Sequence, residues 1–314
     1  MTSYLNTINE LIHILQGNEL PYDHTIIIGN NSSGKSALLK SLLSKNISGK
    51  WYLIDSVNRY FNVGQVFVIE GGFSTTLIQF SEKILEHRLM EDNYNLKDTF
   101  YYMGVPTSIE NFYFDFSREI NRLFSLFLGV ELEIRRSEVG YAVFLDGIES
   151  ELSSGYQALI RIFMEMEYVK RTLENGFIII DEVDEFLFSY NSGRIFEFLR
   201  KEYKNFSFIV TTHSADLIAN AKEANIVLLS DGMYELMDAG DFNSVSQVYN
   251  IFDSISQNEK NIDDKEKIDI SLRRLLNNKV AGIWKAENQN ELACIKDMNL
   301  TKVQKVMIRQ IEEW

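Results

Sequence analysis

The sequence predicts an α/β fold in which a mostly parallel sheet is flanked by helices. Short apolar runs alternate with helical patterns, and a Gly/Ser-rich segment joins the first run to a helix. The apolar runs are continuous rather than alternating, which suits strands that are buried on both faces. The predicted strands are TIIIG (25–29), WYLID (51–55), FIIID (177–181), FSFIVTT (206–212) and NIVLLS (225–230).

The composition limits the classes of protein to consider. The chain has 314 residues, and its 45% apolar content is enough for a sizeable core. Its 31 basic and 45 acidic residues give a net charge of −14, which argues against nucleic acid as the main partner. We find neither an apolar run long enough to span a membrane nor a leader pattern, so we expect a cytoplasmic protein. The single cysteine, Cys294, excludes an internal disulfide framework and is expected to be buried and inert.

Two regions depart from the alternating pattern. We expect residues 1–240 to form one domain that carries an arm, made of a helical segment at about residues 80–130 and a hairpin over residues 130–147. Residues 241–314 should form a helical C-terminal extension, with an exposed charged connection at 258–267. One helix of the arm is predicted by apolar residues that share a face, namely Ile109, Phe112, Phe116, Ile120, Leu123, Phe124 and Phe127.

A phosphate-binding loop is predicted between the first strand and the first helix. Gly29 to Ser36 fits the pattern G-x-x-x-x-G-K-[ST] in the required strand–loop–helix context. Its backbone N–H groups and the positive N-terminal end of the helix would surround a polyphosphate. Lys35 would reach the β- and γ-phosphates, and the Ser36 hydroxyl would coordinate Mg²⁺. The predicted nucleotide-binding residues of this loop are Gly29, Asn30, Asn31, Ser32, Ser33, Gly34, Lys35 and Ser36.

Catalytic side chains are predicted at the ends of two later strands. Asp181 and Glu182 follow the apolar run 177–181, where Asp181 would hold the metal and Glu182 would orient and polarise the attacking water. His213 follows the next strand. If the two strands are neighbours in a parallel sheet, His213 lies beside Glu182, near the γ-phosphate.

A second anion-binding helix end is predicted in ELSSGYQALIRIF (151–163). Ser153, Ser154 and Gly155 open this helix, so hydroxyl groups and free backbone N–H groups meet at its positive end. Such a start is commonplace as a helix cap. Its position between the lysine loop and the Asp-Glu strand is what indicates a function.

In this order, the four segments resemble the motifs of the ATP-binding-cassette (ABC) ATPases. GNNSSGKS is similar to their Walker A motif, LSSGYQ to the signature motif, IIIDE to Walker B and TTHS to the switch histidine. The non-transport branches are the most similar, namely the RecF, Rad50 and SMC heads and the small OLD-like bacterial ATPases. The resemblance implies ATP and Mg²⁺ as cofactors and a homodimer formed with ATP. In that dimer, Ser153, Ser154 and Gly155 of one chain complete the γ-phosphate site of the other.

The expected function is therefore a soluble ATPase whose dimerisation regulates a separate effector protein of a defence or repair type. A transporter subunit and a DNA-repair ATPase of the RecF type are the alternatives. Two residues depart from the family pattern: Tyr156 replaces a glutamine common in transporters, and Phe188 replaces an aspartate or histidine. Gln65 or Gln79 could serve as the lid residue, and Tyr22 is the candidate for stacking on adenine.

Overall fold

The computed structural model describes residues 2–17, 19–30, 33–44, 51–56, 59–66, 100–102, 105–138, 140–230, 233–242, 244–257, 264–280, 282, 284–298 and 300–313. Several predictions fall outside these residues. They are the loop residues Asn31 and Ser32, the lid candidate Gln79 and the part of the arm before residue 100.

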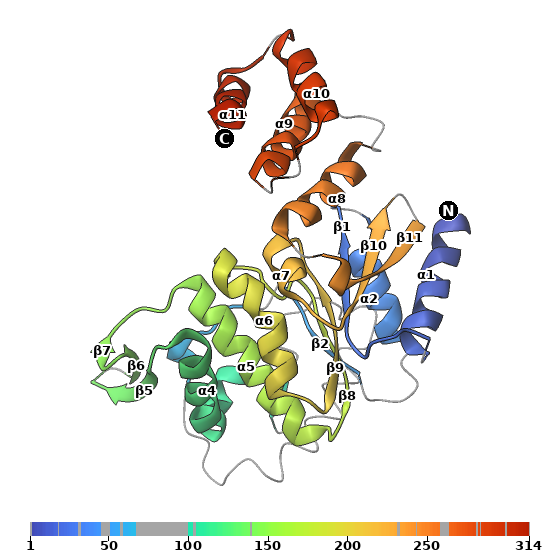
Figure 1. Ribbon diagram of the computed structural model, residues 1–314. Coiled ribbons are helices and arrows are strands. Elements are labelled where there is room, and N and C mark those ends of the chain that lie inside the picture. Colours follow the sequence, from blue (N-terminus) through green and yellow to red (C-terminus); the bar gives the residue numbers. More distant parts are fainter. Residues whose placement is uncertain are drawn as a thin grey trace.

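A six-stranded sheet forms the centre of the fold, in the order β11–β10–β1–β9–β8–β2 (Figure 1). All neighbouring pairs are parallel except β10 with β11 at the edge. The predicted fold class is confirmed, while the antiparallel edge strand β11 is an addition that the sequence analysis did not anticipate. The strands are β1 (Thr25–Gly29), β2 (Trp51–Ile54), β8 (Gly176–Ile180), β9 (Phe206–Thr211), β10 (Asn225–Ser230) and β11 (Met233–Asp238).

Helices cover both faces of this sheet, which is why its strands read as continuous apolar runs. On one face, alternate strand residues such as Ile27 and Ile179 pack against α1 (Thr2–Gln16) and α2 (Lys35–Ser44). Their neighbours Ile28 and Ile180 point to the other face, into a larger core. That core is built with α4 (Tyr113–Leu128), α5 (Ser154–Thr172), α6 (Ser189–Glu202) and α7 (Ala215–Asn220).

The arm contains the predicted helix and hairpin. All seven predicted apolar residues are buried, on η3 (Ile109–Phe112) and α4. The hairpin is formed by β5 (Leu132–Ser137) and β6 (Gly140–Leu145), and Gly140 has φ +88° at its turn. A short third strand, β7 (Ile148–Glu149), pairs with β6, and a separate ribbon joins β3 (Phe100–Tyr102) to β4 (Val105–Thr107). Within the described part of this region, a further short helix, η1 (Val63–Gln65), packs against β6.

Helix α5 passes through the middle of the molecule and is buried on all sides rather than on one face. Every residue from Ala158 to Val169 is buried, including Arg161 and Glu165. The Arg161 guanidinium donates to Glu165 Oε1 at 3.0 Å, and Tyr52 donates to Glu165 Oε2 at 2.8 Å. Ion pairing and hydrogen bonding thus offset the cost of burying these charges.

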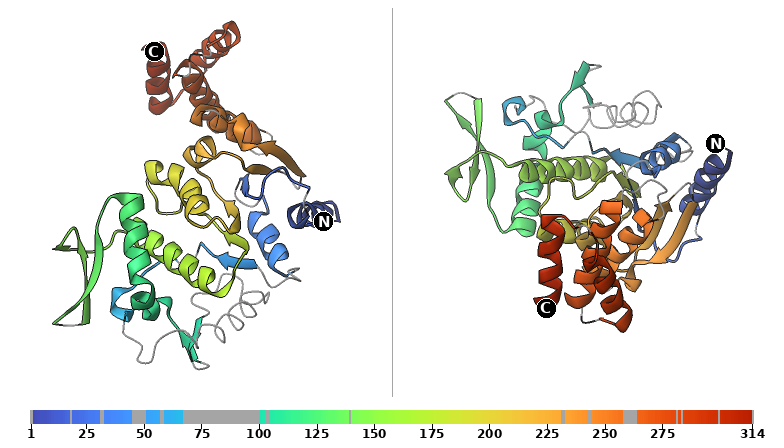
Figure 2. Two further views of the ribbon diagram at one scale, coloured as in Figure 1. Left: turned by 60° about the horizontal axis from the view of Figure 1, so that its bottom comes forward. Right: turned by 90° about the horizontal axis from the view of Figure 1, so that it is seen from above.

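The C-terminal helices form a small core of their own. After η4 (Ala239–Asp241), the chain continues as α8 (Val245–Gln257), α9 (Asp264–Val280), α10 (Ala286–Lys296) and α11 (Lys302–Glu313). Leu275, Ile295 and Ile311 contribute to the core of α9–α11, which lies to one side of the sheet (Figure 2). A domain boundary at residue 240 stays a prediction. The expectation for Cys294 was wrong, because its side chain is exposed on α10.

Candidate functional site

The predicted loop, carboxylates and histidine meet at one edge of the sheet. Strand β9 lies between β1 and β8, and all three run in the same direction. Their carboxyl ends therefore bring together Lys35 after β1, Glu182 after β8 and His213 after β9. Ligands of open α/β sheets bind at this edge.

The backbone of the lysine loop requires glycine at Gly29. Its φ is +154°, and a Cβ atom there would lie 2.5 Å from the carbonyl oxygen of Leu229. Gly34, at the start of α2, has φ +102°. Among the described residues, the buried hydroxyl of Ser33 has no hydrogen-bond partner. The loop thus holds an unused polar atom next to a helix N-terminus, as an anion site would.

Lys35 is folded into its own loop. Its Nζ donates to the carbonyl oxygens of Gly29 at 2.8 Å and Asn30 at 3.1 Å, and the residue is only 8% exposed. Burial lowers the pKa of Lys35, while the negative charges of Glu182 and Asp181 oppose that shift. The ammonium group therefore lies within the influence of both carboxylates, at the mouth of α2.

Asp181 is anchored on every side. Its Oδ1 accepts from the Thr211 hydroxyl at 2.6 Å, and its Oδ2 accepts from the Ser56 hydroxyl at 3.2 Å. Its backbone carbonyl accepts from Arg59 at 2.7 Å. These contacts hold a carboxylate that is 5% exposed in one orientation, which suits a residue that must fix a cation.

Glu182 and His213 face each other at the surface. His213 Nε2 lies 3.9 Å from Glu182 Oε1, and the two side chains are 45% and 39% exposed. Glu182 has φ +49°, and its N–H donates to the Thr211 hydroxyl at 2.7 Å. Burial and then the charge of Lys35 lower the pKa of His213, while Glu182 raises it. The backbone of Glu182 is in the left-handed region, and its half-exposed carboxylate beside an imidazole can accept a proton from water.

The donor set at this edge fits Mg²⁺. The Ser36 hydroxyl is exposed at the start of α2, and Asp181 supplies a carboxylate. Both are hard oxygen donors, and Mg²⁺ is usually held by one or two carboxylates together with substrate phosphates. The described residues contain no group of three or more His, Cys, Asp or Glu side chains that could hold a metal without such a substrate.

The Ser153 end of α5 lies against the loop that follows β8. The Ser153 hydroxyl caps the helix, accepting from the Tyr156 N–H at 3.3 Å, and Ser153 and Ser154 are exposed. Gly155 packs against the backbone of the loop after β8, where a Cβ atom would lie 2.8 Å from the carbonyl oxygen of Phe186. The start of α5 therefore contacts the loop that follows Glu182.

Other residues were missed by sequence reasoning. Asp181 is contacted by Ser56, Arg59 and Thr211. The only sequence signal for these contacts was their position, just after β2 or at the end of β9. Tyr22 lies at the opposite edge of the sheet, where its hydroxyl donates to Asp238 at 2.8 Å. The whole of β1, roughly 15 Å, separates it from the loop, and its role in stacking on adenine stays a prediction. Gln65 is exposed on η1, and its lid role stays a prediction.

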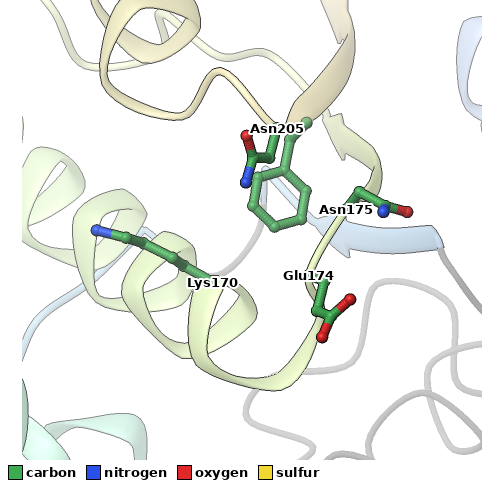
Figure 3. A pocket seen from close by; sticks show the side chains of 5 residues that line it. Lys170, Glu174, Asn175 and Asn205 are labelled. Atoms are coloured by element: carbon green, nitrogen blue, oxygen red, sulfur yellow. The ribbon is translucent and has the colours of Figure 1, made fainter.

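A pocket of about 610 Å³ lies away from these residues. It is lined by Lys170, Glu174, Asn175, Asn205 and Phe206, around the starts of β8 and β9 (Figure 3). This is the amino edge of the sheet, opposite Lys35 and Glu182. We assign no function to the pocket.

No protein-family model matches the chain, and no curated protein is similar to it in sequence. Solved structures similar in fold include a metal-chelate type ABC transporter in an inward-facing conformation, with TM-score 0.37 and 16% identity over 74% of this chain and 79% of that one. The SMC head domain from Thermotoga maritima gives 0.35 and 18%, covering 69% and 90% of the two chains. A structure from work on ATP-driven dimerization of SMC ATPases gives 0.34 and 18%, covering 48% and 98%. At TM-scores below 0.5 and identities below 25%, this likeness carries no argument for an activity.

None of the helices within the described residues has both the length and the apolar character needed to cross a membrane.

Proposed function

We propose that this protein is an ATPase of the ABC type that binds Mg-ATP at the carboxyl edge of its sheet and hydrolyses it. The observation that carries the proposal is the insertion of β9 between β1 and β8, which places His213 3.9 Å from Glu182 and within the electrostatic influence of Lys35. Phosphoryl transfer needs a lysine that binds the phosphates, a carboxylate that holds the metal and a carboxylate that orients the attacking water. All three lie around this one loop.

The roles follow from the contacts. Lys35 leaves the carbonyl oxygens of Gly29 and Asn30 and donates instead to the β- and γ-phosphates. Ser36 and Asp181 would hold Mg²⁺, which supplies positive charge against the phosphate oxygens when bound. Glu182 accepts a proton from the attacking water, because its carboxylate is half-exposed and lies beside His213, whereas the carboxylate of Asp181 is held by two hydroxyl groups. His213 keeps Glu182 in place and lies toward the γ-phosphate.

We propose further that two chains form a dimer around ATP. The N-terminal end of α5, at Ser153, Ser154 and Gly155, offers hydroxyl and N–H donors but no lysine. We therefore propose that it binds a phosphate that another chain presents. Beside it, Phe188 and Tyr190 are 84% and 73% exposed, and such apolar surface favours burial in an interface. Release of the γ-phosphate would remove the link between the two chains. The rate of hydrolysis would therefore set the lifetime of the dimer that a separate effector protein binds.

Turnover measured with Mg-ATP tests the activity. Glu182→Gln keeps the shape of the side chain but removes the proton acceptor, so we expect kcat to fall by roughly 100-fold or more while ATP binding is retained. Glu174→Gln, at the amino edge, is the matched control and should leave turnover unchanged. Unchanged turnover in Glu182→Gln would refute the proposed role of this carboxylate.

The same variant tests the dimer. Because it holds ATP without cleaving it, Glu182→Gln should be monomeric without nucleotide and a stable dimer with Mg-ATP, as measured by light scattering after size exclusion. A monomer at saturating ATP would contradict ATP-driven homodimerisation and would indicate that a different chain supplies the second half of the site.

A further inference from the structure

The loop that carries His213 is tied on both sides to one carboxylate, Asp184. Thr212 Oγ1 donates directly to Asp184 Oδ1 at 2.5 Å. Ser214 reaches the same carboxylate through Ser192, whose hydroxyl donates to Asp184 Oδ2 at 3.1 Å and lies 2.6 Å from the Ser214 hydroxyl. The residues immediately before and after His213 are therefore fixed by a single side chain.

The direction of each hydrogen bond in this cluster follows from the number of protons available. A hydroxyl group has one proton, and an ionised carboxylate only accepts. Thr212 and Ser192 donate to Asp184, so Ser214 donates to Ser192. The Ser214 N–H donates to Thr212 Oγ1 at 2.9 Å, and the Leu217 N–H donates to Ser214 Oγ at 3.2 Å. Two series of hydrogen bonds, one through Thr212 and one through Ser192, therefore end at the Asp184 carboxylate.

Asp184 joins three elements rather than facing the nucleotide edge itself. It belongs to the loop after β8, Thr212 follows β9 and Ser192 lies in α6. Each of its oxygens accepts from a hydroxyl of another element. Its contacts connect the loop of Glu182 to the loop of His213.

We infer that Asp184 is a positioning residue that holds His213 beside Glu182 and the γ-phosphate. The inference rests on the proposed function, because it gives His213 a part in ATP turnover. Without the carboxylate, the hydroxyls of Thr212 and Ser192 lose their shared acceptor. The His213 loop then loses the link from Thr212 to the Glu182 loop, and its link through Ser214 to Ser192 on α6 loses the acceptor that orients it.

Steady-state kinetics on Asp184→Ala and Thr212→Val test the inference. A displacement of the histidine by about 1 Å should lower kcat by ~10- to 100-fold while KM for ATP changes little. Thr212→Ser retains the hydroxyl and should restore kcat. Ser117→Ala, which removes a hydroxyl bonded to the Phe114 carbonyl on α4, is the matched control and should behave as the wild type. Equal loss in Thr212→Ser and Thr212→Val would overturn the role of the hydroxyl.

A double-mutant cycle separates positioning from a general loss of structure. In a His213→Ala background, Asp184→Ala should change kcat by less than about twofold, because the residue it positions is gone. An equal loss in both backgrounds would overturn the inference. If His213→Ala itself left turnover unchanged, the proposed role of His213 would fall instead. Should Asp184→Ala fail to fold by circular dichroism, Thr212→Val replaces it in the cycle.

Discussion

The two edges of the central sheet use similar polar residues for opposite purposes. At the amino edge, Asn225 donates to the carbonyl oxygens of Tyr22 at 2.7 Å and His24 at 2.9 Å, and it is 3% exposed. At the carboxyl edge, Glu182 is strained and half-exposed, and the buried Ser33 hydroxyl has no partner among the described residues. At the amino edge, the Asn225 side chain bonds to groups of the protein itself. At the carboxyl edge, Glu182 and Ser33 offer polar groups that a ligand could bind.

This difference predicts how substitutions should divide. Changes at Glu182 and Ser153, whose side chains are partly or fully exposed, should alter ATP chemistry with little effect on folding. Changes at the amino edge should lower the free energy of unfolding and leave ATP binding unaltered. A single substitution that lowered both the free energy of unfolding and the affinity for ATP would contradict this division between the two edges.

The largest effect is expected for Lys35→Ala. Removing the ammonium group leaves the bound phosphates without their matching charge, which typically costs 2–5 kcal/mol, so the affinity for Mg-ATP should fall by at least about 30-fold. Isothermal titration measures this, with Lys201→Ala on α6 as a control that keeps the wild-type affinity. Wild-type affinity in Lys35→Ala would refute the assignment of the loop.

Ser153→Arg should affect turnover but not binding. The added side chain fills the donor-rich end of α5, and the loss of such donors typically lowers kcat by ~100- to 1,000-fold. Because Ser153 is not part of the lysine loop, the affinity of the isolated chain for ATP should stay the same. Titration and turnover on one preparation distinguish the two effects, and a parallel loss of affinity would place α5 in its own chain's site.

At the amino edge, Asn225→Ala should destabilise the fold. It removes a buried side chain that donates to two carbonyl groups and accepts from the Tyr22 N–H at 3.3 Å. Leaving these groups unpaired costs about 1–3 kcal/mol in the free energy of unfolding. Urea denaturation measures the loss, and Mg-ATP affinity below the transition should be unchanged. A loss of affinity without a loss of stability would contradict the division between edges.

The smallest effect is a pH dependence from His24. Burial lowers the pKa of His24 to about 4, and its Nδ1 accepts from the Phe208 N–H at 3.1 Å. The unfolded chain binds a proton near pH 6.5 and the folded chain near pH 4, so stability falls as pH drops through this range. Allowing for partial exposure, we expect a loss of about 2 kcal/mol. His24→Gln should flatten the pH profile, and an unchanged profile would exclude His24 as the cause.

The sequence was most informative where local pattern and chemistry agree. The five parallel strands of the central sheet were predicted within a residue or two because both of their faces are buried, and the loop at Lys35 because its glycines and lysine have fixed spacing. Arg59 and Thr211 were not predicted, since their roles depend on which strands become neighbours. Cys294 was misjudged because its exposure depends on how α10 packs against α9 and α11.

The central claim, that the Ser153 end of α5 acts on ATP held by another chain, is tested most directly by mixing Lys35→Ala with Ser153→Arg. Each variant by itself should be nearly inactive, because every site in its homodimer lacks one half. A mixed dimer contains one site with Lys35 from the second variant and Ser153 from the first, so turnover should rise well above the sum of the two separate proteins. A mixture no more active than its components, measured at concentrations where wild-type chains dimerise with ATP, would contradict the account.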